Sequence, residues 1–401
     1  MALISTTAAE RLIGDALPRL PIESLPLEQI AGTVLRENIY AERDQPPFDR
    51  VAMDGIALDS AAPRAGIRRL RIQATQAAGD PPLTLASREQ CVEVMTGAVL
   101  PEGCDTVVPV EQITVSQGEA ALEEGLLPEA WQYVHRRGSD TRQGALLLSV
   151  GTRLAAPEVA VAASAGMARV RVSHQPTIAV ISTGNELVDP GEPIAAHQVR
   201  RSNVYGVIAA LRGRGFSRVA DDHVRDEPEA LRTRLRFHLD THEALILSGG
   251  VSVGKFDLVP RTLAELGVRP VFHGVAQRPG RPFWFGVAPT GAAVFALPGN
   301  PVSTLVCLSR YVIPALDAAM GLTAAAPQRI ALEGPFETSA TLTLFLPIRT
   351  QTDASGRTWA QPCPTNGSGD FVALSGTDGF VELPAGAGTV PQGFIARLYR
   401  W

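Results

Sequence analysis

The 401-residue chain is poor in cysteine and in aromatic residues, and neither sign of charge dominates it. Its four cysteines are far apart and form no CxxC pair, which argues against a zinc site or a disulfide framework and predicts reduced thiols. A net charge of −5 argues against general binding to nucleic acid or to an anionic membrane. No signal-peptide pattern opens the sequence, and no uncharged apolar run is long enough to span a bilayer. We therefore expect a cytoplasmic protein with neither a nucleic-acid nor a membrane partner.

Glycine and proline, by contrast, are abundant, at 37 and 31 residues. They indicate many turns and a large share of β structure. The length is too great for one ordinary domain, so we expect two to four compact units. A hydrophobic content of 45% is that of a globular chain able to bury sizeable cores.

Three apolar runs carry most of the information. They span residues 176–187 (PTIAVISTGNEL), 244–254 (ALILSGGVSVG) and 292–303 (AAVFALPGNPVS), and each breaks into a loop of small residues. This is typical of a buried parallel strand that passes the chain to a helix. Three such junctions predict one crevice at the edge of one sheet, where backbone amides and helix N-termini collect an anionic ligand.

Around these runs the pattern predicts a multidomain chain of α/β and β parts. A doubly wound α/β segment begins near residue 174, because strands and helices then alternate until a long helix that Asn300 and Pro301 begin. Other expected elements are a helix over 7–17, a second helix within 21–35, a small β domain of barrel or sandwich type over about 51–134, a helix over 157–166 and a C-terminal β domain from about 326.

Two motifs have competing interpretations. Residues 249–255 (GGVSVGK) match seven positions of a nucleotide P-loop, but Phe256 replaces the Ser or Thr that would bind magnesium. A phosphate cradle therefore remains, while a generic nucleotide hydrolase is disfavoured. His238 and His242 stand four residues apart, yet without a third ligand we expect surface residues rather than a metal site. His273, beside a basic loop, either packs in a partly buried position or contacts ligand.

Charged residues cluster at the predicted strand ends. Glu186, Asp226 and Asp257 each follow a strand, and singly each would be a cap or a solvated acid. Together at one sheet edge they predict a magnesium site, since Mg²⁺ prefers oxygen ligands. Arg278 and Arg281 flank a Pro-Gly turn, and guanidinium groups in a rigid turn suit bidentate phosphate binding, although a solvated turn would read the same way.

These residues lie in a series of motifs that resembles one family. FDRVAMDG, MTGAVLPEGCDTVV, RRGSD, STGNEL, SGGVSVG, RPGRP and LPGNPVS occur in the order seen in the molybdopterin molybdenumtransferase family of bacterial MoeA type, which is similar to the C-terminal domain of gephyrin. The match extends over about residues 5–320. It implies a cytoplasmic homodimer that inserts molybdate into the dithiolene of adenylylated molybdopterin, releases AMP and uses Mg²⁺. It also suggests the molybdopterin adenylyltransferase as a partner.

The resemblance further implies a domain division and a set of site residues. The four domains would be an elongated linker domain (21–48 and 139–173), a β domain facing the partner subunit's cleft (49–138), the α/β molybdopterin-binding domain (5–20 and 174–323) and a C-terminal β domain (324–401). Catalytic positions are matched by Asp54, Thr96, Asp140, Glu186, Asp226 and Asp257, the last three also as metal ligands. Pterin-phosphate and nucleotide positions are matched by Thr183, Gly184, Ser248, Gly249, Gly250, Ser252, Gly254, Arg278, Gly280, Arg281, Pro298, Gly299, Asn300 and Pro301.

The chain also departs from the family pattern. Asn185, Arg201, Lys255, Phe256 and Gly274 stand where the family often has other residues, and these departures are expected to make the cleft more basic and to alter metal stoichiometry, nucleotide recognition or rate. Two hypotheses therefore compete, an active transferase and a catalytically reduced paralogue that carries the pterin or acts as a scaffold. The sequence does not distinguish molybdate from tungstate, because both are tetrahedral dianions of nearly equal size.

Overall fold

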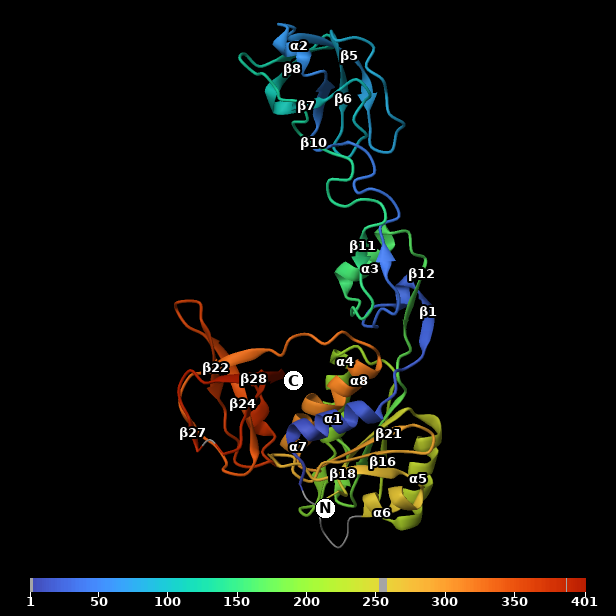
Figure 1. Cartoon of the computed structure of the whole chain (residues 1–401), viewed down its shortest axis with the longest axis vertical. Helices are drawn as coiled ribbons and strands as arrows, with labels where there is room; N and C mark the ends of the chain where they lie inside the picture. The colour runs from blue at the N-terminus through green and yellow to red at the C-terminus, as the bar shows by residue number, and fades with distance from the viewer. Residues whose placement is uncertain (1–2, 252–257, 387) are drawn as a thin grey trace. The chain divides into compact units, whose positions relative to one another are not determined.

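The structure is a computed structural model that describes residues 3–251, 258–386 and 388–401 (Figure 1). It divides into two compact units. The first comprises Met1–Glu37, Val150–Val159 and Arg169–Trp401, and the second comprises Asn38–Ser149 and Ala160–Ala168. We describe each by itself. The four-domain division stays a prediction.

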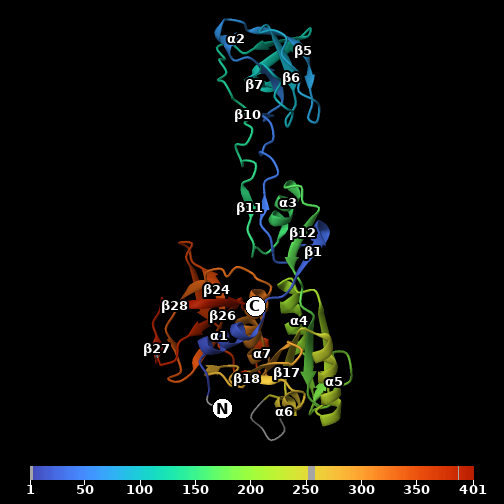
Figure 2. The same ribbon diagram turned by 45° about the vertical axis from the view of Figure 1, so that its right-hand side comes forward.

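The second unit is built on a six-stranded sheet of order β7-β4-β6-β5-β9-β8 (Figure 2). Successive residues of its central strands point to opposite faces, and both faces are buried: Ala57, Val92 and Val107 join one core while Ile56 and Val108 join the other. The strands are β4 (Gly55–Leu58), β5 (Arg69–Gln76), β6 (Gln90–Val94), β7 (Thr106–Pro109), β8 (Ile113–Ser116) and β9 (Glu119–Leu122). The small β domain expected here is confirmed.

Short elements complete this unit. They are β2 (Ile39–Tyr40), paired with β11 (Leu146–Leu148), β3 (Arg50–Val51), paired with β10 (Val134–His135), the helix α2 (Ala61–Arg64) and the 3₁₀ turn η2 (Val110–Gln112). The helix α3 (Ala156–Ser164), expected from the sequence, spans the division between the two units.

The first unit contains the expected α/β sheet, of order β16-β13-β17-β21-β20-β18. The first four strands run parallel, and β20 and β18 extend the sheet by antiparallel pairing. The bounds are β13 (Ile178–Thr183), β16 (Val219–Val224), β17 (Ala244–Ser248), β18 (Arg269–His273), β20 (Trp284–Val287) and β21 (Ala293–Leu297). The three apolar runs supply the neighbouring strands β13, β17 and β21, so their carboxyl ends meet at one edge.

Helices cover both faces of this sheet (Figure 1). One face packs against α1 (Thr6–Ala16), α4 (Asn203–Gly213), α7 (Pro301–Cys307) and α8 (Ile313–Ala319), and the other packs against α5 (Pro228–Thr241) and α6 (Leu258–Glu265). Burying a Val, Leu or Ile side chain contributes about 1.5–3 kcal/mol, so these two cores dominate the stability of the fold. The sequence predicted each of these helices, and Ser5 caps α1 by accepting a hydrogen bond from Ala8 N.

The long helix predicted from Pro301 is interrupted by a π-helical turn. This turn, η3 (Leu308–Val312), lies between α7 and α8, and Pro314 follows it. Because Pro314 lacks an N–H, the helix loses a regular hydrogen bond one turn back, which is where the wider turn occurs. Within the part of the chain that the structure describes, Pro301–Ala319 is the one helix long and apolar enough to span a membrane, but 78% of that window is buried in the core.

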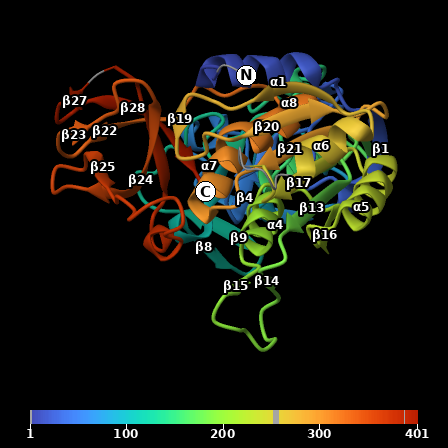
Figure 3. The same ribbon diagram turned by 90° about the horizontal axis from the view of Figure 1, so that it is seen from below.

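The C-terminal strands form a closed β-barrel beside the α/β sheet (Figure 3). Strands β24, β25, β22, β28 and β26 pair in that order, and β26 pairs back to β24. Their bounds are β22 (Arg329–Leu332), β24 (Thr343–Thr352), β25 (Thr358–Pro362), β26 (Gly379–Leu383) and β28 (Ile395–Arg400), with η4 (Val372–Leu374) and the small pair β23 (Phe336–Glu337) and β27 (Thr389–Val390). One strand of the α/β part, β19 (Gln277–Arg278), joins the barrel at β24.

The predicted helix within residues 21–35 is wrong. Residues Ile22–Pro26 form the strand β1, which pairs antiparallel with β12 (Arg169–Ser173), and a 3₁₀ turn η1 (Leu27–Gln29) follows. Pro26 removes an amide that a helix would need, and pairing with a distant strand supplies hydrogen bonds that the local pattern did not reveal.

Candidate active site

A cavity of about 780 Å³ lies at the carboxyl edge of the parallel strands. Its walls come from the loops after β13, β16, β17 and β21 and from the start of α4, as the three apolar runs predicted. Of the residues predicted for the site, it brings together Thr183, Glu186, Asp226, Ser248, Gly249, Gly250, Pro298, Gly299, Asn300 and Pro301.

Glycine is required where two of these loops touch. Gly249 has a φ of +104°, and a Cβ there would lie 2.6 Å from the Thr183 carbonyl oxygen. A Cβ on Gly299 would meet the Gly249 backbone at 3.4 Å. Larger residues would therefore separate the loops and change the cavity.

Asn203, at the first position of α4, connects the strand-end loops. Its Nδ2 donates to Ser248 Oγ at 2.9 Å, to the Gly299 carbonyl at 2.7 Å and to Thr304 Oγ1 at 3.3 Å. None of the motifs in the sequence identified Asn203 as a site residue. The signal that was missed is an amide side chain at the start of the helix that follows the first of the three runs.

Two acidic residues reach the cavity beside an unsatisfied hydroxyl. Glu186 follows β13 and Asp226 follows β16, and both line the wall. Thr183 is 4% exposed, and its Oγ1 has no hydrogen-bond partner among the described residues. All three residues offer oxygen atoms to the cavity, which is the donor type that Mg²⁺ prefers. The third predicted ligand, Asp257, lies outside the described residues, as do Ser252, Gly254, Lys255 and Phe256. Within the described ranges no group of three metal-ligating side chains forms.

The turn formed by Arg278, Pro279, Gly280 and Arg281, here called the arginine turn, borders an adjoining cavity of about 690 Å³ between the α/β part and the barrel. Arg278, Gly280 and Arg281 line it, and Pro282, Pro298 and Asn300 line both cavities. Asn300 occupies the N-cap position of α7, but its side chain does not cap the helix. Its Nδ2 instead donates to Ser368 Oγ at 2.7 Å and so connects the shared wall to the barrel.

Gln277 holds the arginine turn from below. It is fully buried, its Nε2 donates to the Pro279 carbonyl at 3.1 Å, and its Oε1 accepts from Tyr311 Oη at 2.5 Å. Gly280 has a φ of +91°, and a Cβ there would lie 2.6 Å from both Gln277 Nε2 and Cys307 Sγ. Arg278 and Arg281 are exposed on this fixed support, so their guanidinium groups can meet an anion in the cavity.

His273 takes one of the two positions predicted for it, whereas His238 does not lie where it was predicted. His273 is partly buried, and its Nε2 lies 3.3 Å from the Val251 carbonyl, so it packs beneath the loop after β17. His238 was expected at the surface, and this is wrong, because the residue is 3% exposed with Nε2 2.8 Å from Asp222 Oδ2. The carboxylate also binds Arg234, which allows a polar side chain to be buried on α5.

Arg201 does not add an uncompensated charge to the cavity. It is 7% exposed, with Nε 2.6 Å from Asp189 Oδ1 and Nη2 2.9 Å from Asp221 Oδ2. Burial alone would lower the Arg201 pKa, but the hydrogen bonds to the two carboxylates outweigh it and raise the pKa. The expectation that Arg201 makes the cleft more basic is therefore wrong. The residue instead fixes the segment that contains β14 (Leu187–Val188) and β15 (Val199–Arg200), whose connecting loop projects in Figure 3.

Gly184 belongs to the first unit but is not among the residues that line the cavity, whereas Asp54, Thr96 and Asp140 belong to the second unit. Asp54 Oδ1 accepts hydrogen bonds from Thr96 N and Thr96 Oγ1, both at 2.7 Å, and these bonds lower the pKa of Asp54. Asp140 Oδ1 lies 2.7 Å from His135 Nε2, and His135 Nδ1 accepts from Arg50 Nη2 at 2.9 Å. The MDG and MTGA motifs are thus joined directly, while the RRGSD aspartate belongs to a separate pair with a histidine that the sequence analysis did not identify.

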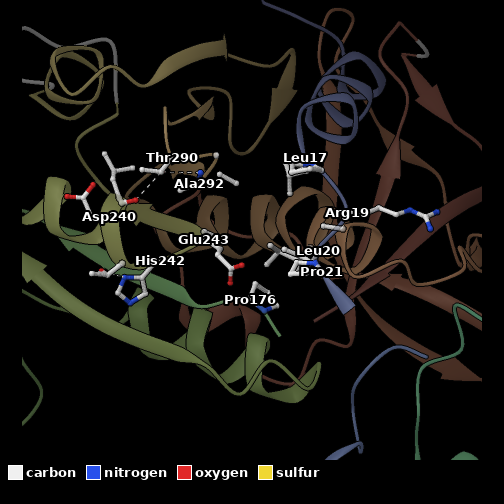
Figure 4. A pocket seen from close by; sticks show the side chains of 18 residues that line it. Leu17, Arg19, Leu20, Pro21, Pro176, Asp240, His242, Glu243, Thr290 and Ala292 are labelled. Carbon is white, nitrogen blue, oxygen red and sulfur yellow. Dashed lines mark hydrogen bonds between the residues drawn. The ribbon is translucent and has the colours of Figure 1, made fainter. Parts of the chain in front are cut away.

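A further cavity of about 390 Å³ lies at the opposite edge of the α/β sheet, where β17 and β21 begin (Figure 4). Leu20 and Ala292 lie at its wall, and the Glu243 carboxylate lies beside them. That carboxylate already accepts hydrogen bonds from Thr177 N at 2.9 Å and contacts His174 Nε2 at 3.1 Å. Glu243 therefore supports the sheet edge, and the cavity at the carboxyl edge remains the candidate active site.

Comparison with known proteins shows which family the chain is similar to. Three family models match successive parts of the chain, described as the MoeA N-terminal region (domain I and II) over residues 4–166, a probable molybdopterin binding domain over 179–318 and the MoeA C-terminal region (domain IV) over 330–398. Relatives named molybdopterin molybdenumtransferase include one from Synechocystis sp., 38% identical over the whole of both chains. Another, from Synechococcus elongatus, is 32% identical over 98% of this chain and 97% of its own.

The chain is also similar to solved structures over its full length. A structure of a molybdopterin biosynthesis MoeA protein from Pyrococcus horikoshii is 27% identical, with a TM-score of 0.77 and coverage of 100% of this chain and 99% of the other. A second structure, also described as that protein, is 22% identical and supports the fold alone, with a TM-score of 0.80 over 100% of both chains.

Proposed function

Because the chain belongs to the MoeA-type molybdopterin molybdenumtransferase family, we propose that the cavity at the carboxyl edge of its α/β sheet is where the transferase reaction takes place. The protein acts in molybdenum cofactor biosynthesis as a molybdopterin molybdenumtransferase. The observation that carries the proposed site is the meeting of Glu186, Asp226 and the β17 and β21 loops in one cavity, which shares the wall residues Pro298 and Asn300 with the cavity of the arginine turn.

The substrates are two anions, molybdate and adenylylated molybdopterin. We assign Arg278 and Arg281 to the binding of phosphate or molybdate oxygens, because arginines on a rigid support pair with oxyanions at low entropic cost. Gln277 and Gly280 keep this support fixed. Ser248 and the Gly249–Gly250 turn line the neighbouring cavity, where the rest of the pterin nucleotide would lie.

The acidic residues have a different role. Glu186 and Asp226, together with Asp257, would hold Mg²⁺, which when bound supplies positive charge to the pyrophosphate and favours departure of AMP. Thr183 ends β13 with its hydroxyl against the Gly249–Gly250 turn, and this hydroxyl, which has no hydrogen-bond partner among the described residues, would orient a bound oxygen. Carboxylates alone would repel these substrates, so their presence in an anion site is accounted for by a cation.

We further propose that the protein is a homodimer in which Asp54, Thr96 and Asp140 of each subunit complete the site of its partner. The support is chemical, since each aspartate is fixed by a specific donor, from Thr96 or from His135, although it lies at the surface of a small β domain. Such fixed surface carboxylates are costly in side-chain entropy and are typical of binding or catalytic positions.

The test is release of AMP from adenylylated molybdopterin with molybdate and magnesium, alongside equilibrium binding of the pterin nucleotide. We expect Glu186→Gln and Asp226→Asn to lower AMP release at least tenfold while the pterin nucleotide still binds. Glu192→Gln, an exposed acid on the β14–β15 loop, is the matched control and should keep wild-type turnover. Tight binding without molybdate-dependent AMP release by the wild type would overturn the proposed site chemistry in favour of a carrier.

A further inference from the structure

A separate cavity of about 530 Å³ lies between α1, the η3–α8 segment and the strand β28 of the barrel. Four arginines line it, against two carboxylates, Glu10 and Asp317. Both carboxylates are already engaged, since Glu10 Oε2 lies 2.8 Å from Arg310 Nη2 and Asp317 pairs with Arg153. Arg214 and Arg400 line the cavity with no carboxylate partner within ion-pair distance among the described residues. The cavity therefore carries uncompensated positive charge.

Polar atoms in its wall are also unsatisfied. Ser309 is 8% exposed and Arg310 is 1% exposed, and in the described part of the chain Ser309 Oγ and Arg310 Nη1 have no hydrogen-bond partner. A buried donor without an acceptor costs about 1–3 kcal/mol, so a ligand that supplied acceptor oxygens would recover that energy. Both residues lie in the π-helical turn η3, and such turns occur frequently at functional sites.

Aliphatic side chains make up another part of the wall. Ile13 of α1, Ile313 and Pro314 of α8, and Leu322 after it face the same space. Arginines and a hydroxyl on one part of the wall, with aliphatic side chains on another, suit a molecule that carries an anionic group on an apolar body.

We propose that this cavity binds a small phosphate ester with an apolar body and that its occupancy is transmitted to the arginine turn of the active site. The connection is short. Ser309 and Arg310 face the cavity, and the next residue, Tyr311, donates to Gln277 Oε1, while Gln277 Nε2 holds the Pro279 carbonyl between Arg278 and Arg281. A shift of η3 on binding therefore moves the support of the turn, and the cavity is a regulatory site behind the catalytic one.

Phenyl phosphate is the probe, and isothermal titration calorimetry on the full chain measures its binding. We expect saturable binding to the wild type and at least tenfold weaker binding to the double variant Arg397→Ala/Arg400→Ala. Arg397 and Arg400 lie on β28, and this variant leaves the buried Arg310 and its ion pairs with Glu10 and Glu382 in place. Arg329→Ala, an exposed arginine of the same barrel outside the cavity, is the control and should bind like the wild type.

Binding of phenyl phosphate at Arg278 and Arg281, rather than in this cavity, would give a different pattern among the variants. The proposal is overturned if Arg278→Ala/Arg281→Ala loses phenyl phosphate binding while Arg397→Ala/Arg400→Ala retains it, or if the wild type does not bind the probe at millimolar concentration.

The transmission is tested by the KM for adenylylated molybdopterin in AMP release, with and without saturating phenyl phosphate. We expect at least a twofold change in the wild type and none in Tyr311→Phe, which still binds the probe. An unchanged KM in the wild type, or an equal change in Arg397→Ala/Arg400→Ala, would overturn it. Only this second measurement rests on the proposed function, so failure of the calorimetric test and failure of the transferase assay are distinguishable.

Discussion

Asn203 and Gly299 are joined by a 2.7 Å hydrogen bond from the side-chain amide to the backbone carbonyl, although 96 residues separate them in the chain. The same amide also reaches Ser248. One side chain therefore fixes the relative positions of two strand-end loops on which the candidate active site is built, and it does so from a third element, α4.

Replacing Asn203 tests this role. We expect Asn203→Ala to lose about 0.5–1.5 kcal/mol of folding stability, because Ser248 Oγ and the Gly299 carbonyl lose their hydrogen-bond donor. AMP release should fall at least tenfold, since small displacements of positioning groups are costly to catalysis. Urea denaturation and the AMP-release assay measure the two effects. Asn38→Ala, which removes an exposed bond to Tyr40, should change neither. Wild-type turnover by Asn203→Ala would contradict the positioning role.

Substitutions in the arginine turn should weaken ligand binding without lowering the stability of the fold. Arg278→Ala and Arg281→Ala are expected to weaken binding of the pterin nucleotide or of molybdate at least tenfold, while the melting temperature stays within about 2 °C, since exposed arginines stabilise little. Equilibrium binding and thermal unfolding check this pair of outcomes. A large loss of thermal stability would show that these arginines support the fold rather than a ligand.

Asp222 should make the stability of the first unit depend on acid pH. Burial alone would raise the pKa of Asp222, but hydrogen bonds from His238 and Arg234 outweigh it, so the folded pKa lies below the ordinary value of 3.8. The ionised pair therefore stabilises the fold above the unfolded pKa, and this contribution is lost as the pH falls through the folded pKa. We expect urea denaturation to show Asp222→Asn less stable than the wild type at pH 6, with the gap narrowing as the pH falls below 3.8 and through the folded pKa. Asp240→Asn, an exposed position on the helix α5 that also carries His238 and Arg234, should show no such gap.

The hydrogen bonds from Thr96 to Asp54 should determine the pH below which the enzyme loses activity. Thr96 lowers the pKa of Asp54 by donating from its backbone and its hydroxyl. Thr96→Val removes the hydroxyl donor, so the pKa of Asp54 rises and the carboxylate is protonated at higher pH. In the pH profile of AMP release, the acid limb should move to higher pH in Thr96→Val and return in Thr96→Ser. An unmoved limb in the valine variant would exclude Asp54 as the group responsible.

Thiol reactivity should follow burial. Burial raises the pKa of Cys91, Cys104 and Cys307 to about 12, whereas Cys363 is partly exposed. Because the thiolate is the reactive form, iodoacetamide at pH 8 should modify Cys363 alone in the native protein and all four cysteines in urea. Mass spectrometry of the labelled peptides gives the answer, and rapid labelling of Cys307 would mean that the helix beneath Gly280 opens readily.

The local pattern predicted the α/β part closely because its strands and helices have strong periodic signals and clear ends. Pro301 and Pro228 begin helices, and the three apolar runs end where the strands end. The helix expected within 21–35 failed because β1 depends on pairing with β12, nearly 150 residues later, and no local pattern encodes that partner. His238 was misplaced for a related reason, since its burial depends on Asp222 from a different strand.

The sequence by itself determined the chemistry available at the site: the acids after the strands, the arginines of the turn and the glycines that allow loops to touch. Side-chain type and spacing along a strand or turn are local properties, so they can be read from the chain. Only the tertiary structure decided how those groups are held in place and how nearby charges are neutralised. Asn203 spans two loops, Tyr311 supports the arginine turn through Gln277, and Arg201 is neutralised by Asp189 and Asp221. These contacts join residues distant in sequence, and their energy depends on a geometry that exists only after the sheet and its helices have packed.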